Sequence, residues 1–394
     1  MTRFGLPLPG ATLALAAVTT FGLEAVAAGE LERLGYSERT VENGRVCFSG
    51  GLQDIPRCNL WLRTADRLLV RLAEFPAADF DQLFEAVRSL DWAAFLPEDA
   101  RIQVTARSLH SKLSSLPACQ ATVKKGIVEA LHRRYRRQRF PESGPAYAVD
   151  LALNRDRALL TLDTSGPGLH RRGYRRRAGE APLRETLAAA LVLLSRWDPT
   201  RVLADPCCGS GTIPIEAALL ASGLAPGRLR SFAAEQWPHL PARLWSEARE
   251  QAREAEARAA TAGLRILASD RDPRVLELAG ENARKAGVAD GVRFQVRPAE
   301  EFHSSEPYGC LICNPPYGER SGELPEVEAL YRSLGRVLPR LPDWSVFILS
   351  AHPRFQQLYG RRADKNRKLY NGNLKTYLYS FYGPLPRHQG VNDA

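Results

Sequence analysis

The chain has 394 residues, of which 44% are hydrophobic and 25% charged, as in an ordinary soluble globular protein, and its length predicts two or three domains. Seven cysteines without regular spacing argue against a disulfide framework, and no apolar run is long enough to span a membrane, so we expect a cytoplasmic protein. Lysine and arginine total 54 against 44 acidic residues, and the resulting net charge of +10 favours a polyanionic partner over the alternative of a generally basic, arginine-rich protein.

The amino-terminal region resembles a signal peptide in its apolar run, but two prolines and two glycines interrupt that run. We instead expect a strand over 13–19 that leads into a helix over 23–34, whose apolar residues recur at helical spacing. Short strands are predicted at 45–49 and around Leu69. This order predicts a small ferredoxin-like domain over residues 1–72.

The next segment, residues 73–166, mixes helices and strands. A helix is expected from Asp81, a strand at 101–106 and a second helix at 123–135. Two strands, 147–153 and 157–163, are predicted to pair as a hairpin. With its basic character, this α+β pattern resembles a THUMP domain, an RNA-binding module.

Two basic runs, 132–139 and 170–177, each hold five arginines and one tyrosine. Arginines can contact phosphates while a tyrosine ring stacks on a base, although the first run can also be read as the solvated end of a helix. The residues that we predict to contact RNA are Lys112, Arg133, Arg134, Arg136, Arg137, Arg171, Arg172, Tyr174 and Arg175.

A third domain is predicted over residues 167–394 and begins with a helix after Pro182. A strand at 202–204 then leads into Asp205-Pro206-Cys207-Cys208-Gly209-Ser210-Gly211-Thr212 and a helix over 213–220. Two glycines one residue apart let a ligand approach the backbone closely. Because Pro214 replaces the third glycine of the dinucleotide fingerprint and no Gly-Lys-Ser/Thr follows, neither NAD nor ATP is favoured.

A second acid follows a second strand, at Asp270 after 264–269. An acid in this place binds ribose hydroxyls, whereas Asp205 suits a positively charged ligand. S-adenosylmethionine, which joins an adenosine to a sulfonium, fits both features. Residues 221–262 separate the two motifs, and the sequence leaves open whether this insertion covers the pocket or extends the surface.

Asn314-Pro315-Pro316-Tyr317 follows the apolar strand 311–313. An exocyclic amine of a nucleobase is a poor nucleophile, because its lone pair is delocalised into the ring. The Asn314 amide oxygen and the Pro315 carbonyl can accept hydrogen bonds from such an amine, and Tyr317 can stack on the base. Taken alone, the four residues are also compatible with an ordinary turn after a strand.

Together these motifs resemble those of class I methyltransferases that act on amino groups, and residues 169–175, 179–186 and 367–373 extend the resemblance to THUMP-containing bacterial guanine-N2 methyltransferases of 23S ribosomal RNA. The resemblance implies a Rossmann-like α/β domain with a mixed seven-stranded sheet and S-adenosylmethionine as cofactor. It also implies a guanine as substrate, which must be flipped out if it lies in a helix, with Asn314, Pro315 and Tyr317 as catalytic residues. The implied cofactor-binding residues are Glu185, Thr186, Asp205, Cys207, Gly209, Gly211, Thr212, Asp270, Arg271, Glu300 and Asn314.

The sequence departs from this family at Pro298, where an aspartate usually holds the adenine; Glu300 is the candidate substitute. Three alternatives stay open: a guanine in transfer RNA, the N6 amine of adenine, and a non-catalytic RNA-binding or ribosome-assembly protein. Cys310 and Cys313 form a C-x-x-C pair without a second pair, so no metal is expected. No membrane partner is expected, and the oligomeric state is not predicted.

Overall fold

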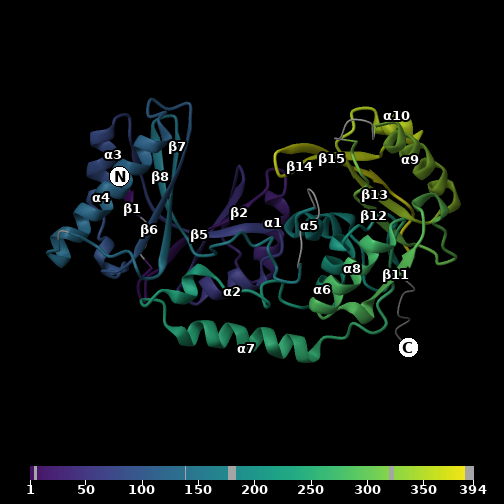
Figure 1. Ribbon diagram of the computed structural model, residues 1–394, viewed down its shortest axis with the longest axis horizontal. Coiled ribbons are helices and arrows are strands. Elements are labelled where there is room, and N and C mark those ends of the chain that lie inside the picture. The colour runs from purple at the N-terminus through teal and green to yellow at the C-terminus, as the bar shows by residue number, and fades with distance from the viewer. Residues whose placement is uncertain (4–6, 138, 176–182, 319–323, 387–394) are drawn as a thin grey trace, which may run out of the picture. The chain divides into compact units, whose positions relative to one another are not determined.

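A computed structural model describes residues 1–3, 7–137, 139–175, 183–318 and 324–386. The chain forms two compact units, each built from several segments (Figure 1). The first unit comprises residues 1–19, 27–169 and 230–253, and the second comprises 20–26, 170–229 and 254–394. Each unit therefore contains a segment that lies far from the rest of that unit in the sequence.

The first unit is built on one sheet in the order β3-β4-β2-β5-β8-β7-β6, with β1 also paired to β5. All neighbours are antiparallel except β6 and β7. Its strands are β1 (Thr2–Arg3), β2 (Leu13–Thr19), β3 (Arg39–Glu42), β4 (Arg45–Gly50), β5 (Ala65–Pro76), β6 (Arg101–Leu109), β7 (Ala146–Asn154) and β8 (Arg157–Asp163). Its helices are α1 (Glu24–Arg33), α2 (Asp54–Trp61), α3 (Phe80–Arg88) and α4 (Leu116–Tyr135).

Strand β5 joins the ferredoxin-like and THUMP-like parts of this sheet. It has 12 residues, pairs with β2 from Ala65 to Arg71, and pairs with β8 from Leu69 to Pro76. The predicted ferredoxin-like and THUMP architecture is confirmed, and the two parts share one continuous sheet. Helix α4 begins at Leu116 rather than at 123, because Ser115 and Pro117 provide a helix start upstream of the apolar stripe.

Part of the 221–262 insertion belongs to the core of the first unit. Phe232, Trp237 and Trp245 are buried there among residues of the THUMP-like part. The Trp237 ring stacks on Tyr147 with centroids 4.8 Å apart, and its Nε1–H donates to the carbonyl of Ala146 at 3.0 Å. Residues 230–253 thus complete a hydrophobic core to which they are not adjacent in the sequence.

The same aromatic stack makes the first unit sensitive to acid. His239 stacks on Trp237 and Tyr147, and burial lowers the pKa of its imidazole to about 4. The unfolded chain therefore binds a proton below about pH 6.5 that the folded chain does not bind until about pH 4. We expect this group to reduce the stability of the protein by at most about 3 kcal/mol as the pH falls through that window.

The measurement is the pH dependence of the urea unfolding midpoint for the wild type and for His239→Phe, which keeps an aromatic ring and removes the titrating group. The remaining titratable groups are the same in both proteins, so the difference between the two curves isolates the contribution of His239. Parallel curves between pH 4 and 6.5 would contradict the prediction.

The second unit is built on a seven-stranded mixed sheet in the order β11-β10-β9-β12-β13-β15-β14 (Figure 1). Strands β9 to β13 are parallel, and β15 runs antiparallel to both β13 and β14. The strands are β9 (Leu203–Asp205), β10 (Ile266–Asp270), β11 (Val292–Val296), β12 (Cys310–Cys313), β13 (Ser345–Ser350), β14 (Lys365–Asn371) and β15 (Leu374–Phe381). This confirms the predicted Rossmann-like methyltransferase sheet.

Helices cover both faces of this sheet, which explains why β12 is apolar throughout. Cys310 and Ile312 face one hydrophobic cluster, and Leu311 and Cys313 face another. The first cluster includes residues of α5 (Glu185–Ser195), α6 (Thr212–Ala221) and α8 (Pro273–Lys285), and the second includes residues of α9 (Leu324–Val337) and α10 (Phe355–Tyr359).

Residues 20–26 belong to the second unit, where they lie against β14. Leu23 is buried in the same cluster as Leu369, and the carbonyl of Gly22 accepts a hydrogen bond from Arg367 at 3.2 Å. A Cβ at Gly22, whose φ is +94°, would lie 2.7 Å from the Lys368 carbonyl oxygen, so this position requires glycine. Of the helices in the described parts of the chain, none is long and apolar enough to cross a membrane.

Candidate active site

The sheet order brings the predicted motifs together at one edge. Strand β9 lies between β10 and β12, and all three are parallel. Asp205 ends β9, Asp270 ends β10, and Asn314 directly follows β12. The carboxyl ends of neighbouring parallel strands form the usual ligand crevice of an open α/β sheet, so these three side chains frame one site.

The loop between β9 and α6 is held against the end of β10. The Gly209 N–H donates to Asp270 Oδ2 at 2.9 Å, and the Cys207 N–H donates to Asp205 Oδ1 at 3.1 Å. Gly209 and Gly211 have φ values of +52° and +82°, a region in which residues with side chains are strained. The two acids therefore fix the shape of a loop that only glycine accommodates.

The electrostatics of this loop favour a cationic ligand. Asp205 is 1% exposed, and burial, together with the negative charge of Asp270, holds its pKa well above the usual range for a carboxyl. A positive charge placed next to Asp205 would stabilise its ionised form. The two carboxylates thus fit a ligand that carries both ribose hydroxyls, which donate hydrogen bonds, and a positive charge, as the sequence predicts for S-adenosylmethionine.

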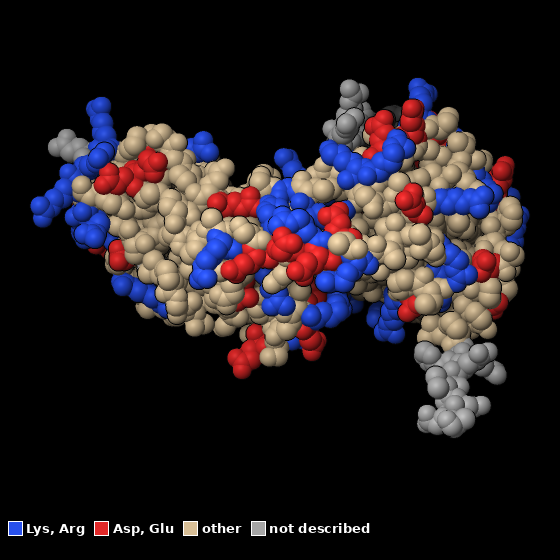
Figure 2. All heavy atoms as spheres, turned by 90° about the horizontal axis from the view of Figure 1, so that it is seen from below, with Lys and Arg blue, Asp and Glu red and all other residues tan. Residues whose placement is uncertain are grey.

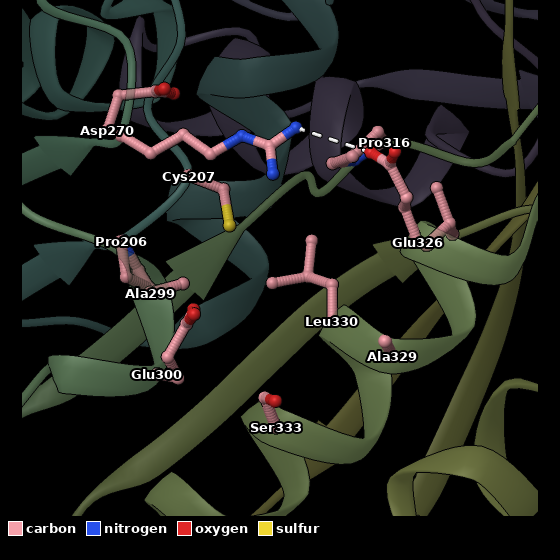
Figure 3. A pocket seen from close by; sticks show the side chains of 12 residues that line it. Pro206, Cys207, Asp270, Ala299, Glu300, Pro316, Glu326, Ala329, Leu330 and Ser333 are labelled. Carbon is pink, nitrogen blue, oxygen red and sulfur yellow. Dashed lines mark ion pairs between the residues drawn. The ribbon is translucent and has the colours of Figure 1, made fainter. Parts of the chain in front are cut away.

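A cavity of about 620 Å³ opens beside these strand ends, a size typical of small-molecule sites (Figure 3). Four of the predicted cofactor-binding residues line it: Cys207, Asp270, Arg271 and Glu300. Arg271 lies 3.9 Å from Glu326 of α9, and both side chains are largely exposed. The remaining wall comes from Pro206, Ala299, Pro316 and the α9 residues Glu326, Val327, Ala329, Leu330 and Ser333.

Sequence reasoning missed the contribution of α9 to this cavity. Leu330 points from the helix toward Cys207 (Figure 3). The apolar residues of α9 recur at helical spacing, but this periodicity indicates only a buried face. Nothing in that pattern distinguishes a face that lines a cavity from one that packs on a sheet.

The turn after β12 is held in place by hydrogen bonds. The Tyr331 hydroxyl donates to the carbonyl of Pro316 at 2.8 Å and lies 3.0 Å from Ser350 Oγ. The Tyr317 hydroxyl donates to Asn314 Oδ1. In this structure, therefore, the amide oxygen that is predicted to accept from a base is bonded to the tyrosine that is predicted to stack on it. Residues 319–323 lie outside the described part of the chain.

The predicted residues at the start of α5 lie outside the 620 Å³ cavity. Glu185 and Thr186 are buried, and burial raises the pKa of the Glu185 carboxyl despite the nearby Arg175. Arg175 Nη1 lies 3.4 Å from Glu185 Oε1, and its Nη2 donates to Thr212 Oγ1 at 2.6 Å. Arg175 therefore links the beginning of α5 to the beginning of α6 instead of extending into solvent.

Two further residues that are predicted to contact RNA are structural. Arg172 is 2% exposed and pairs with the fully buried Glu216 at 3.4 Å. Tyr174 is 1% exposed and donates from its hydroxyl to Glu216 Oε1 at 3.2 Å. The prediction that Arg172 contacts phosphates and that Tyr174 stacks on a base is corrected, because neither side chain reaches solvent. Arg171, next to His170 in the same loop, is exposed.

The other predicted RNA contacts lie on the surface of the first unit. Arg133, Arg134, Arg136 and Arg137 are exposed at the end of α4. Lysine and arginine side chains gather at this end of the unit on the face seen in Figure 2. Arg137 lies 2.9 Å from Glu98 in a largely exposed ion pair. Lys112 is also exposed, while its backbone N–H donates to Asp156 Oδ1 at 2.7 Å.

The part of the chain that the structure describes contains no group of three or more histidine, cysteine or acidic side chains arranged to hold a metal ion. Cys310 and Cys313 are both fully buried in β12. They are three positions apart in the strand and therefore face opposite sides of the sheet, so this C-x-x-C pair does not converge on one point.

Comparisons with protein families cover most of the chain. Residues 172–380 match a model described as an RMKL-like methyltransferase domain. Residues 14–69 match the RlmL ferredoxin-like domain, and residues 77–163 match the THUMP domain.

Similar proteins include the putative RNA methyltransferase YpsC of Bacillus subtilis, which is 45% identical over 96% of this chain and 99% of its own length. The ribosomal RNA large subunit methyltransferase K/L of Aliivibrio fischeri is 38% identical over 91% of this chain but over 52% of its own length, so this chain spans about half of that relative. Among solved structures, the putative methyltransferase SMU.472, complexed with SAH, is 42% identical with a TM-score of 0.88, over 98% of this chain and 100% of its own.

Proposed function

This chain belongs to the RMKL-like methyltransferase family, and we propose that it transfers a methyl group from S-adenosylmethionine to the exocyclic N2 amine of a guanine in 23S ribosomal RNA. It is a methyltransferase, and its cofactor is S-adenosylmethionine. The observation that carries the proposal is the position of Asn314-Pro315-Pro316-Tyr317 at the end of β12, next to the two acid-tipped strands and the 620 Å³ cavity.

The cofactor contacts that we propose come from three acidic residues of the described chain. The carboxylate of Asp270 is suited to the ribose hydroxyls, and Asp205 balances a positive charge near the glycine loop. Pro298 stands where an aspartate usually accepts from the adenine amine. Glu300 lines the cavity, and its carboxylate is the acceptor that we propose in place of that aspartate. When bound, the cofactor supplies an electrophilic methyl group.

The chain's own residues prepare the base. Asn314 Oδ1 and the Pro315 carbonyl accept hydrogen bonds from the exocyclic amine and thereby localise its lone pair. For this to happen the Tyr317 hydroxyl releases Asn314 Oδ1, and its ring becomes available to stack on the base. Most of the acceleration then comes from holding the amine in line with the methyl group, and no covalent nucleophile is required.

We propose RNA contacts on each unit by itself, five residues on the first and Arg171 on the second. Arginines are the residues best suited to phosphate oxygens, and the exposed set consists of Lys112, Arg133, Arg134, Arg136, Arg137 and Arg171. The choice of ribosomal RNA follows the activity for which the K/L relatives are named, and a target inside a helix would have to be flipped out.

The test is transfer of tritiated methyl groups to purified 23S RNA and to bulk transfer RNA, followed by nucleoside analysis. We expect N2-methylguanosine in 23S RNA alone. N2-methylguanosine in transfer RNA alone, or N6-methyladenosine in either RNA, would contradict the proposed substrate. Absence of any transfer, to free RNA and to ribosomal particles alike, would favour a non-catalytic RNA-binding protein.

A further inference from the structure

A second cavity, of about 430 Å³, lies in the second unit where the chain leads into α5. Its lining contains four arginines, one histidine and one acid. These residues are Arg171, Arg172, Arg175, Arg184, His170 and Glu185. We propose that this arginine pocket, the cavity lined by those six residues, binds a phosphate group of the RNA backbone next to the target nucleotide. The inference rests on the proposed RNA methyl transfer and names a substrate subsite for it.

The arginines of the pocket fall into two pairs with different roles. Arg172 is committed to Glu216, and Arg175 to Glu185 and Thr212. Arg171 is exposed and Arg184 is half-buried. Glu216 balances the charge of Arg172 and Glu185 balances that of Arg175, so the excess positive charge of the lining comes from Arg171 and Arg184 and favours an anion.

The buried residues make the loop that carries Arg171 rigid. Arg172 and Tyr174, on either side of Gly173, are anchored on Glu216 inside the unit. Gly173 has a φ of +98°, and a Cβ there would lie 2.5 Å from the Leu229 carbonyl oxygen, so the backbone packs closely at this point. Arg171 is therefore presented from a fixed backbone, which lowers the entropic cost when its guanidinium binds a phosphate.

The position of the pocket links it to the transfer site. Arg175 lines the pocket and donates to Thr212 Oγ1, on the first residue of α6 directly after the glycine loop. The pocket also lies at the amino terminus of α5, an 11-residue helix whose dipole favours an anion there. A phosphate in the pocket would thus be held by elements that also shape the cofactor loop.

An anionic group could come from the RNA backbone or from the carboxylate of the cofactor's methionine part, and the pocket suits the backbone better. It is a cavity separate from the one lined by Asp270 and Glu300. Arg171 is exposed, as expected for a contact with a large substrate that arrives from solvent. Guanidinium groups also match the geometry of phosphate oxygens, to which they can donate two hydrogen bonds at once.

The test compares Arg171→Gln/Arg184→Gln with the wild type and with Arg293→Gln. Arg293 is an exposed arginine on the edge strand β11 of the same unit and serves as the matched control. Filter binding of 23S RNA is measured between about 50 and 200 mM salt, and affinity for S-adenosylhomocysteine is measured by calorimetry on the same preparations.

We expect the double variant to bind RNA about tenfold more weakly than the wild type at about 0.1 M salt. The slope of log affinity against log salt should be shallower by about 0.7–0.9 for each phosphate that the variant no longer neutralises. Cofactor affinity and the behaviour of Arg293→Gln should match the wild type. An unchanged slope, or a loss of cofactor affinity with RNA binding intact, would overturn the inference.

Methyl transfer by the wild type distinguishes failure of this inference from failure of the proposed function on which it rests. If the wild type still forms N2-methylguanosine, either contrary result removes the phosphate subsite and leaves the proposed function standing. Failure of the wild type to methylate RNA would instead remove the proposed function itself, and the phosphate subsite with it.

Discussion

Replacing Asn314 by alanine is expected to lower the rate of methyl transfer about a thousandfold, while loss of its implied contact with the cofactor weakens cofactor affinity by less than about tenfold. The amide oxygen lies at the end of β12 and is proposed to accept from the target amine, so the substitution removes an interaction made in the transition state. Single-turnover transfer to 23S RNA and calorimetric titration with S-adenosylhomocysteine measure the two effects separately.

Three variants make this prediction specific. Asn366→Ala removes an exposed asparagine from strand β14 of the same unit and should leave both quantities unchanged. Asp270→Ala should instead lower the affinity for the cofactor, because Asp270 lines the cavity and accepts a hydrogen bond from the Gly209 N–H. Tyr317→Phe removes the hydroxyl that occupies Asn314 Oδ1 and keeps the ring, so transfer should persist. Full activity of Asn314→Ala would refute the proposed chemistry.

Replacing Arg172 by methionine is expected to destabilise the second unit by about 3–5 kcal/mol. Glu216 is fully buried, and the substitution removes the guanidinium that balances its carboxylate while the hydrogen bond from the Tyr174 hydroxyl remains. The cost is that of an uncompensated buried charge, so Arg172→Met/Glu216→Leu should recover most of the stability. The free energy of unfolding in urea measures both.

A partly exposed ion pair supplies the control for this experiment. Arg332, whose side chain is 50% exposed, lies 3.0 Å from Glu328 one helical turn away on α9, and Glu328, which is 13% exposed, also pairs with Arg354. Arg332→Met should therefore cost less than about 1 kcal/mol. Equal effects of Arg172→Met and Arg332→Met would contradict the structural role of the buried pair. A folded Arg172→Met/Glu216→Leu protein with a reduced salt dependence of RNA binding would restore the expectation that Arg172 contacts phosphates.

The second unit can be predicted well from the sequence because its signals are local. Strand β12 is apolar at every position, as a strand covered on both faces must be, and Asp205 and Asp270 end strands that can be recognised one at a time. The parallel order then follows from general rules for such sheets, and it brings the motifs to one edge.

The features that the sequence does not predict depend on contacts between distant segments. Arg172 lies in an arginine-rich run that is typical of a solvated surface, and its burial depends on Glu216, which lies in a helix with no other acid. Leu23 fits the apolar stripe of α1 in the sequence, yet it packs with Leu369 in the second unit. Neither contact leaves a periodic signal along the chain.

The interleaved construction of the two units has a consequence for the nascent chain. When the ribosome has synthesised residue 169, the sheet of the first unit is complete, but Phe232, Trp237 and Trp245 have not yet been made. At a rate of synthesis of about 5–20 residues per second, several seconds pass before Trp237 is made and can stack on Tyr147. During that interval the apolar face that Phe232, Trp237 and Trp245 later cover is exposed to solvent, so we expect the nascent chain to be prone to nonspecific association until residues 230–253 have emerged.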